Sequence, residues 1–553
     1  MRRETLAIVL VALACAPSPA GAAEPGGYAA LARAAAAPWP AMQRPDGSFR
    51  EYIPGHDPRN KDDYGEAMLG YGLLQAGLRD GDRAQIDAGL RAVTRDATLP
   101  NAVPTLRMFR DMAIAGAYNL ARDRLAGDQE FERVRPAWEK RLREVRADRL
   151  LPGKKVTNKT LVEAVLVMEL DRSGLSAETP GTVLADPPGS VRLVQRLLDG
   201  RLPRVRSRDG TLLGDSPDFP LAYHALSTAF LAKAIELLGP RASARSKRLL
   251  DEALTASWAL TGPDGDLTYW GRSQEQIWAL TLTAYAAEYG RGALSASEIA
   301  PLGALADRVL ARITREHRGG PAAFAITPAL ARSIRGGSRG VDSYASSVQY
   351  SGLNLVAVNW AADAARPGLP VGELAADREG SSVLGRGSSR FAAVRAGDIW
   401  YVVRQAPSAG GDLRYDFGLV ALKQRDPDGS WRDALPLRPH PRRVPDSAGP
   451  VLNGAQPVGR SLTVAPFGRV TIKGAFPARR GVRVVFEPVG CSGLQVFVTP
   501  TRPSDSYEYS LFVRPGDTAP DGRRERGYAS GTDPSLTRVR KTQRGHFNIA
   551  TCR

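Results

Sequence analysis

Cysteine and histidine are scarce in this chain, which has three cysteines and five histidines among 553 residues. The histidines are scattered, and no Cys or His spacing matches a zinc site, so we expect no metal and no cofactor. Cys15 lies in an apolar N-terminal segment, which leaves Cys491 and Cys552 as the one remaining pair. In an oxidising compartment these two could form a disulfide that ties the C-terminus to the last strands.

Long apolar runs are missing beyond the N-terminus, so we expect no membrane span in the mature chain. The start of the sequence has the form of a secretory signal, with two arginines, an apolar core over Leu6–Cys15 and small residues at 20–22. We therefore expect residues 1–22 to be a signal peptide and the protein to be secreted or periplasmic. A lipoprotein anchor at Cys15 is the less favoured alternative, because the preceding residues fit that cleavage box poorly.

Positive charge is in excess, with a formal net charge of +17. The basic residues are mostly isolated, no lysine or arginine block extends beyond a pair, and no nucleic-acid-binding motif is present, so nucleic acid is a poor candidate partner. An acidic polysaccharide or an anionic cell surface suits an exported basic protein better, because opposite charge raises the association rate. A biased genomic base composition would also produce an arginine-rich chain. We expect a monomer.

Strand signals are nearly absent between Tyr28 and about Trp360, where apolar residues recur at helical spacing. The predicted helices cover residues 64–77, 106–125, 131–145, 161–170, 191–198, 221–238, 249–260, 277–289 and 302–313. Asp-Gly turns at 46–49, 209–212 and 264–267 each precede a helix, which is typical of equivalent loops around one opening. We therefore predict paired helices in an α/α toroid over residues 24–365.

Composition changes after the helices. Residues 366–390 are rich in glycine, serine and proline and predict a linker. Beyond it, segments with a period of two alternate with turn residues, which is typical of an antiparallel β-sandwich over residues 391–553. The predicted strands are 391–394, 399–405, 415–423, 461–464, 469–473, 482–487, 494–499 and 507–513. The predicted fold is thus multidomain α and β, with a helical toroid followed by a sandwich.

The stretch 264–288 combines an Asp-Gly turn, a dense aromatic and polar segment and an amphipathic helix. The dense segment contains Tyr269, Trp270, Arg272, Gln274 and Glu275. Aromatic rings stack on sugar faces, while guanidinium and amide groups bind carboxylates and hydroxyls. The segment therefore indicates a sugar site at the opening of the toroid. The structural alternative is a solvated helix start with two core aromatics.

Three other segments carry candidate functional groups. Asn158, followed by Lys159, precedes an apolar helix and could aim an amide at a substrate carboxylate, although Thr160 and Glu163 also form a plausible capping box. Tyr223 and His224 fall in a first helical turn after a proline, near any opening built from helix starts. Their structural alternative is a hydrogen-bonded core histidine beside a core tyrosine.

Tyr344 lies among small polar residues that could expose its hydroxyl to a cavity, and Tyr350 follows it closely. The structural alternative is a pair of aromatics on one helix face.

A secreted helical domain followed by an antiparallel β-sandwich, with these loops, resembles the α/α-toroid polysaccharide lyases. The heparinase II/III-like and hyaluronate/chondroitin lyase groups are the nearest. The resemblance implies cleavage of a uronic-acid-containing acidic polysaccharide by β-elimination. That reaction needs a group that neutralises the C6 carboxylate, and a tyrosine or histidine that removes the C5 proton.

Carried over by resemblance, Asn158 is similar to the carboxylate-binding asparagine and His224 to the catalytic histidine. Tyr269 is similar to the tyrosine that acts as base and acid, and Arg272 to the assisting arginine. Tyr223 and Tyr344 are rivals for the tyrosine role. Substrate contacts are expected from Tyr223, Trp270, Gln274, Glu275, Tyr344 and Lys159. This set needs no metal.

Two other functions remain open. A glycoside hydrolase on the same scaffold needs paired carboxylates across a cavity, and Asp215, Asp218, Asp264, Asp266 and Glu275 are available. A non-catalytic carbohydrate-binding protein of the cell envelope would use the same aromatics and basic surface.

Overall fold

The computed structural model describes residues 27–550 with gaps, and the predicted signal peptide lies outside the described residues. Beyond residue 501 only the strand backbones are described. The gaps are 54–63, 100–106, 146–157, 176–186, 205–211, 214–219, 272, 295, 333–345, 387–388, 406–416, 435–449, 452–456, 477–479, 491–492, 502–506, 514–522, 527–536 and 544.

Six of the described helices form a closed ring, because each contacts the next and the last returns to the first. In ring order they are α3 (Gly65–Asp80), α5 (Arg107–Arg124), α7 (Asn158–Ser173), α9 (Leu221–Leu238), α11 (Ile277–Ala293) and α14 (Ser347–Ala364). We call these the ring helices. Most of their residues are buried, because they contact neighbours within the ring and an outer helix behind it.

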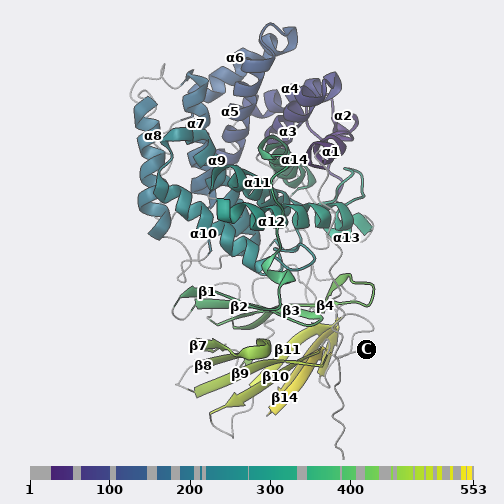
Figure 1. The fold of residues 1–553 in the computed structure, drawn as a ribbon. Helices are drawn as coiled ribbons and strands as arrows, with labels where there is room; N and C mark the ends of the chain where they lie inside the picture. The colour runs from purple at the N-terminus through teal and green to yellow at the C-terminus, as the bar shows by residue number, and fades with distance from the viewer. Residues whose placement is uncertain are drawn as a thin grey trace, which may run out of the picture.

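An outer layer of helices packs behind the ring (Figure 1). It consists of α4 (Arg83–Thr98), α6 (Gln129–Arg143), α8 (Pro187–Arg196), α10 (Ala244–Leu260) and α12 (Ala296–Glu316), with α1 (Gly27–Ala36) behind α14 and α3. Two further helices, α2 (Trp39–Met42) and α13 (Pro328–Arg332), are short. Outer and ring helices alternate along most of the chain, which confirms the predicted α/α toroid.

Local sequence signals fix several helix starts. The side chains of Asp82, Asp128 and Ser243 accept hydrogen bonds from backbone N–H groups in the first turns of α4, α6 and α10. A capping box of Ser346 and Gln349 begins α14. Among the described helices, the segment Leu221–Arg241 is long and apolar enough to cross a membrane by length and composition alone. Its most apolar stretch of 18 residues is 78% buried inside the protein.

The C-terminal part of the chain, from Gly380 on, is built from antiparallel sheets, as predicted (Figure 1). The first sheet has the order β1 (Gly380–Arg386), β2 (Ser389–Ala396), β3 (Ile399–Arg404), β4 (Gly418–Arg425) and β5 (Trp431–Asp433). The second has the order β14 (Gly545–Ala550), β10 (Gly493–Pro500), β9 (Arg480–Val489), β8 (Val470–Phe476) and β7 (Val458–Val464). A third has the order β12 (Arg523–Arg526), β13 (Thr537–Gln543), β11 (Tyr507–Val513) and β6 (Pro450–Val451).

Both faces of the first sheet are buried. Along β2, Phe391 and Ala393 belong to the core of the helical domain, whereas Ala392 and Val394 belong to a second core shared with the second sheet. Side chains on a strand alternate between its two faces, so one sheet joins both cores. The first sheet is therefore the central layer between the toroid and the second sheet.

The boundaries and some elements differ from the sequence-based predictions. Strand β1 begins at Gly380 and so lies inside the predicted 366–390 linker, where its glycines and serines had indicated a connector. Helices α4 and α14 were not predicted. Strands β12 and β13, which are rich in arginine and lysine, were not predicted either. Each predicted helix and strand overlaps an observed one.

Cys491 and Cys552 lie outside the described residues, so their disulfide stays a prediction. The strands that they flank, β10 and β14, pair in antiparallel register with Leu494 opposite Ala550. In this register the start of β10 lies beside the end of β14, which is the arrangement that the predicted disulfide requires.

Close contact between α3 and α14 closes the ring. A Cβ atom on Gly352 would lie 2.7 Å from the backbone nitrogen of Leu69, which is too close for an alanine. We predict that Gly352→Ala destabilises the protein by roughly 1–3 kcal/mol in urea unfolding, because the helices must separate. Gly200→Ala is the control, since nothing lies within 4 Å of its added Cβ. Equal stability of the two variants would contradict a tight ring closure.

Candidate functional site

The starts of the ring helices gather at one end of the toroid, because an outer helix carries the chain back between most successive ring helices. The first turns of five of them, or the residue before, hold an aromatic side chain. These are Tyr64, Phe109, Tyr223, Trp278 and Tyr350, which we call the aromatic collar. The sixth ring helix, α7, begins with Asn158 instead.

Ring contacts join the collar residues in two groups. The ring centroids of Tyr223 and Trp278 are 5.9 Å apart, and those of Trp278 and Tyr350 are 5.6 Å apart. Tyr64 stacks on Phe109 at 4.8 Å. Four of these rings are buried, whereas Tyr223 is partly exposed. The collar therefore forms an aromatic floor in which Tyr223 is the accessible member.

Below the collar the ring is packed with aromatic side chains. Phe230 of α9 contacts Phe109 of α5 at 6.1 Å and Trp360 of α14 at 5.7 Å. These helices are not neighbours in the ring order, so the rings meet across its centre. The toroid is filled at this level, and a bound chain would have to lie above the collar.

Asn158 is buried at the first position of α7, and its Oδ1 accepts a hydrogen bond of 2.9 Å from the backbone N–H of Lys159. This contact orients the amide, and no described residue accepts a hydrogen bond from its Nδ2. Lys159 is partly exposed beside it. The helix begins at Asn158, two residues before the predicted capping box at Thr160.

His224 lies in the core and not at the opening. Its Nδ1 accepts a hydrogen bond of 3.0 Å from the backbone N–H of Leu213, and its Nε2 lies 3.1 Å from the carbonyl oxygen of Ala253. Because Nδ1 accepts, the proton is on Nε2 and points at that carbonyl. The side chain has no exposed surface, so the geometry supports the structural alternative for His224 and not a general base.

Tyr269 and Trp270 contact the first sheet and do not line the opening. The hydroxyl of Tyr269 donates a hydrogen bond of 2.6 Å to the carbonyl of Leu260, and its ring meets Trp400 of β3 at 5.7 Å. Burial raises the pKa of Tyr269 well above its usual value, which opposes a role as base. Trp270 packs edge-on against Phe391 of β2. These two aromatics attach the toroid to the sheet.

Gln274 is likewise buried, and its Nε2 donates a hydrogen bond of 2.8 Å to the carbonyl of Gly271. Arg272 and Tyr344 lie outside the described residues, so their predicted roles stay predictions. Of the ten candidates, the structure places Asn158, Lys159 and Tyr223 at the starts of neighbouring ring helices. It separates these from Tyr269 and Trp270, which face the sheet.

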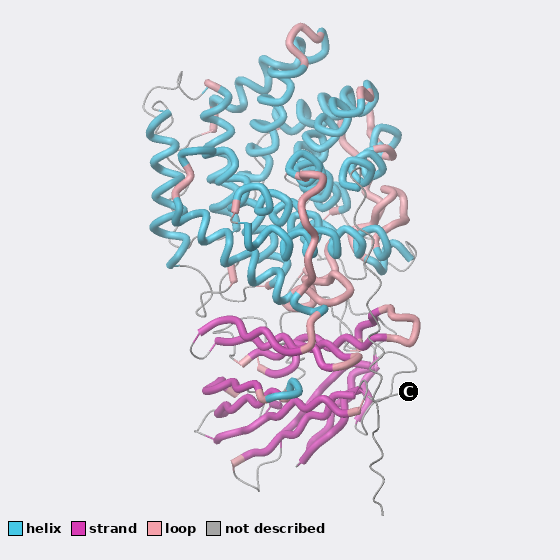
Figure 2. Tube along the Cα trace, in the orientation of Figure 1, coloured by secondary structure: helices cyan, strands magenta, loops and turns pink. Residues whose placement is uncertain are grey.

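A cluster of mostly buried charges lies where the loop 262–276 meets the first sheet. Figure 2 shows loops running between the helical region and the strands. Lys423 of β4 is fully buried, and its Nζ lies 2.8 Å from Asp264, 3.5 Å from Asp266 and 2.6 Å from Asp433. Arg312 of α12 pairs with both Asp264 and Asp266. We call these five residues the charge cluster.

The pKa values in the charge cluster follow from its pairing. Burial alone would raise the pKa of Asp264, but Lys423 and Arg312 outweigh it and hold the pKa below its usual range. Arg312 and Lys423 likewise lower the pKa of Asp266, so these two buried aspartates are kept ionised. Within the described residues, no group of three or more His, Cys, Asp and Glu side chains is arranged to hold a metal ion.

The charge cluster and the collar, including Trp278, could not be recognised as sets from the amino-acid sequence. Two of the three predicted Asp-Gly turns do occupy equivalent positions in the toroid. Gly47 and Gly265 both have positive φ, and each packs against the backbone of an outer helix, at Arg91 of α4 and Arg308 of α12 respectively. The turns are thus equivalent in structure. The third turn, at 209–212, lies mostly outside the described residues.

Glu275 is partly exposed in a strained part of the same loop. Ser273 and Glu275 have φ values of 61° and 57°, which side-chain-bearing residues rarely adopt. Burial raises the pKa of the Glu275 carboxyl to about 7, Asp433 and Asp266 add to this, and Arg312 opposes it. Strain and a perturbed carboxyl in one loop are typical of a functional site.

We predict that Lys423→Met destabilises the protein by about 3 kcal/mol or more, because it leaves the buried Asp264 and Asp266 with Arg312 as their one cation in the charge cluster. The measurement is urea unfolding at neutral pH. Lys473→Met, an exposed lysine on β8, should change stability by no more than about 0.5 kcal/mol. A loss as small as that of the control would show that the cluster does not hold the two parts together.

The raised pKa of Glu275 has a consequence for stability against pH. The folded protein binds the Glu275 proton more strongly than the unfolded chain does. The stabilisation of the fold by this proton is therefore fully present below about pH 4.5 and is lost as pH rises towards 7. We predict that Glu275→Gln removes roughly 1–3 kcal/mol of this loss between pH 4.5 and 8. Unfolding free energies at both pH values measure it. Glu132→Gln, on the exposed face of α6, should instead keep the pH dependence of the parent protein.

Comparisons with known proteins bear on the fold. No protein-family model matches the chain, and no curated protein sequence matches it. Heparinase III is similar in structure with a TM-score of 0.50 and 8% identity, covering 95% of this chain and 83% of that one.

Two further structures are more distant. A second heparinase III, with methylated lysines, has a TM-score of 0.45 and 10% identity, over 87% of this chain and 75% of that one. A possible member of the GH105 family from Salmonella enterica has a TM-score of 0.40 and 13% identity, over 63% and 96%. The likeness at a TM-score of 0.50 shows that the chain shares the toroid-and-sheet architecture of heparinase III.

Proposed function

We propose that this protein is a polysaccharide lyase that cleaves a uronic-acid-containing acidic polysaccharide by β-elimination. The observation that carries the proposal is the placement of Asn158 and Tyr223 in the first turns of α7 and α9. These ring helices contact each other. An amide donor and a phenol therefore stand at the starts of two neighbouring ring helices.

Asn158 is assigned to the substrate carboxylate. Its Oδ1 is held by the backbone of Lys159, so the Nδ2 hydrogens remain for the uronate. Hydrogen bonds to that carboxylate, with the charge of the Lys159 ammonium nearby, stabilise the carbanion-like state that forms when the C5 proton leaves. Lys159 thereby adds positive charge where negative charge develops.

Tyr223 is assigned as the base and acid. Of the collar residues it is the one with exposed surface, and its ring packs against Trp278. In the reaction the phenolate takes the C5 proton, a double bond forms between C4 and C5, the C4–O bond breaks, and the leaving oxygen receives a proton. This role passes from Tyr269 to Tyr223 because the Tyr269 hydroxyl is bound to the carbonyl of Leu260.

Two other features support an acidic polymer as substrate. The net charge of +17 raises the association rate with a polyanion. Within the aromatic collar, the partly exposed ring of Tyr223 offers an apolar face to a sugar ring. We also propose that the protein acts after export, because its first 22 residues have the form of a signal peptide.

One observation favours a glycoside hydrolase instead. Glu275 has a pKa of about 7 and is therefore poised as a general acid. A hydrolase also needs a second free carboxylate. Among the described residues near Glu275, Asp264, Asp266 and Asp433 are all paired with Lys423, which leaves the elimination chemistry better supported.

We predict that the protein releases 4,5-unsaturated products from at least one uronate polymer, measured by ultraviolet absorbance across heparan, chondroitin, hyaluronan, alginate and glucuronan. Tyr223→Phe should lower kcat by roughly 10²–10⁴-fold, since it removes the proton-transfer group. Tyr269→Phe is the matched control and should keep most of the activity. Circular dichroism of both variants checks that they fold.

The outcomes separate the candidate functions. Cleavage without an absorbing product would indicate a hydrolase, and binding without cleavage would indicate a non-catalytic protein. Full activity of Tyr223→Phe with loss in Tyr269→Phe would overturn the assignment of the base.

A further inference from the structure

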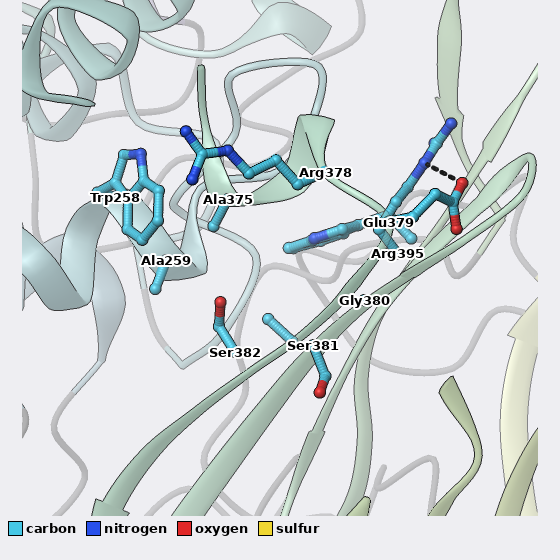
Figure 3. A pocket seen from close by; sticks show the side chains of 11 residues that line it. Trp258, Ala259, Ala375, Arg378, Glu379, Gly380, Ser381, Ser382 and Arg395 are labelled. Carbon is cyan, nitrogen blue, oxygen red and sulfur yellow. Dashed lines mark ion pairs between the residues drawn. The ribbon is translucent and has the colours of Figure 1, made fainter. Parts of the chain in front are cut away.

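A cavity of about 200 Å³ lies at the junction between the toroid and the first sheet (Figure 3). We call it the junction pocket. Its walls come from the end of α10, from the connector around η9 (Ala375–Asp377) and from β1, β2 and β3. No residue that lines it belongs to a ring helix, so it is separate from the aromatic collar.

Trp258 of α10 forms the wall on the helical side of the junction pocket. The residue is partly exposed, and its indole nitrogen donates a hydrogen bond of 2.9 Å to the carbonyl oxygen of Glu373. This bond fixes the ring at the pocket, which the small side chains of Ala259 and Ala375 also line (Figure 3). A fixed and partly exposed indole is a surface on which the apolar face of a sugar ring packs.

Arg378 lies on the same side of the pocket and extends towards Trp258 (Figure 3). Its Nε donates a hydrogen bond of 3.1 Å to the carboxylate of Glu373, the residue whose carbonyl also holds Trp258. One glutamate thus anchors both groups, so the guanidinium and the indole stay near each other. The two terminal nitrogens of Arg378 donate to no described residue, which leaves them for a ligand.

Ser382 of β1 lines the pocket from the sheet. Side chains alternate along a strand, and Figure 3 shows the Ser382 hydroxyl on the side where Trp258 lies, whereas Ser381 points away from it. Ser382 stands opposite Ala393 of β2, whose small side chain also lines the pocket. The Ser382 hydroxyl therefore adds a donor and an acceptor across the pocket from the indole.

The charges around the junction pocket are balanced. Arg378 is paired with Glu373, and Nε of Arg395 lies 3.7 Å from the carboxylate of Glu379. Arg395 is directed away from Trp258, and its guanidinium lies 4.2 Å from the ring centroid of Trp431 (Figure 3). Each arginine thus has a carboxylate of its own, so the pocket has no excess of either charge and favours an uncharged ligand.

We propose that the junction pocket binds one uncharged sugar residue, with the apolar face of its ring on Trp258 and its hydroxyls on Arg378 and Ser382. A rigid aromatic face with a few convergent polar groups is the usual composition of a small-molecule site. The inference goes beyond the proposed function, because it adds a non-catalytic carbohydrate site away from the collar. Such a site keeps a polysaccharide attached to the protein independently of the groups that cleave it.

The test is equilibrium titration of the full chain with methyl β-glucoside, followed by tryptophan fluorescence and by calorimetry. We expect saturable binding that changes less than about twofold between low and high salt, because the ligand carries no charge. Sorbitol, which has hydroxyls but no rigid ring, should not bind. Absence of saturable glucoside binding would overturn the proposal, as would binding of methyl glucuronide that is about tenfold tighter or more.

Matched variants locate the glucoside. Trp258→Ala and Arg378→Gln should each weaken its binding at least about tenfold, because they remove the support of the ring and the donors to its hydroxyls. The controls are Trp431→Ala, on β5 outside the pocket, and Arg469→Gln, an exposed arginine before β8. Both controls should bind the glucoside as the parent protein does.

A third variant, Ser382→Phe, fills the pocket without removing a charge and should also weaken glucoside binding at least about tenfold. Circular dichroism of every variant checks that it folds. Glucoside binding that survives both Trp258→Ala and Ser382→Phe but is lost in Tyr223→Ala would place the sugar at the collar and overturn the proposal.

The junction pocket and the proposed function fail separately. If no polymer is cleaved but glucoside binding depends on Trp258 and Arg378, the pocket stands and the lyase proposal falls. If polymers are cleaved with unsaturated products but Trp258→Ala binds the glucoside normally, the pocket proposal alone falls.

Discussion

The ion pairs between Lys423 and the aspartates of the loop 262–276 hold the first sheet against the helical domain. Lys423 has no exposed surface, and it reaches from β4 to Asp264 and Asp266 at the open end of the toroid. Buried charges of this kind are expensive unless every one is paired, so the arrangement tolerates little displacement. Around it, Tyr269 and Trp270 pack edge-on against Trp400 and Phe391.

This attachment has a consequence for the site. The loop before α11 is held against the sheet, so its aromatic residues serve the contact between domains. In the proposed function, substrate chemistry falls to the starts of the other ring helices, where α7 supplies an oriented amide and α9 supplies a partly exposed phenol. The strain at Ser273 and Glu275 lies in the same loop, between the attachment and the first turn of α11.

Much of the fold could be predicted from the sequence, because helical periodicity and period-two alternation are local signals. The toroid, the order of its parts and the antiparallel sheets follow from them. Helix α4 and the strands β12 and β13 escaped because charged residues break up their apolar pattern. Strand β1 was missed because its glycines and serines are also typical of a linker.

The site was harder to predict, because its members are brought together by ring closure and not by sequence spacing. Tyr269 and Trp270 looked like sugar-binding residues, and nothing in their segment shows that a strand more than a hundred residues later covers them. His224 and Tyr223 are adjacent in sequence, yet one faces the core and the other is partly exposed. Pairing partners such as Lys423 and Asp264 are 159 residues apart, beyond any local pattern.

The central claim is that the bond between sugars is broken by elimination and not by water. Cleavage of a uronate polymer in water enriched in ¹⁸O, followed by mass spectrometry of the products, tests it most directly. Elimination adds no water, so the account predicts that the two product masses sum to that of the substrate and that neither new end gains ¹⁸O by cleavage. One atom of ¹⁸O incorporated for each bond broken would contradict the account and establish hydrolysis.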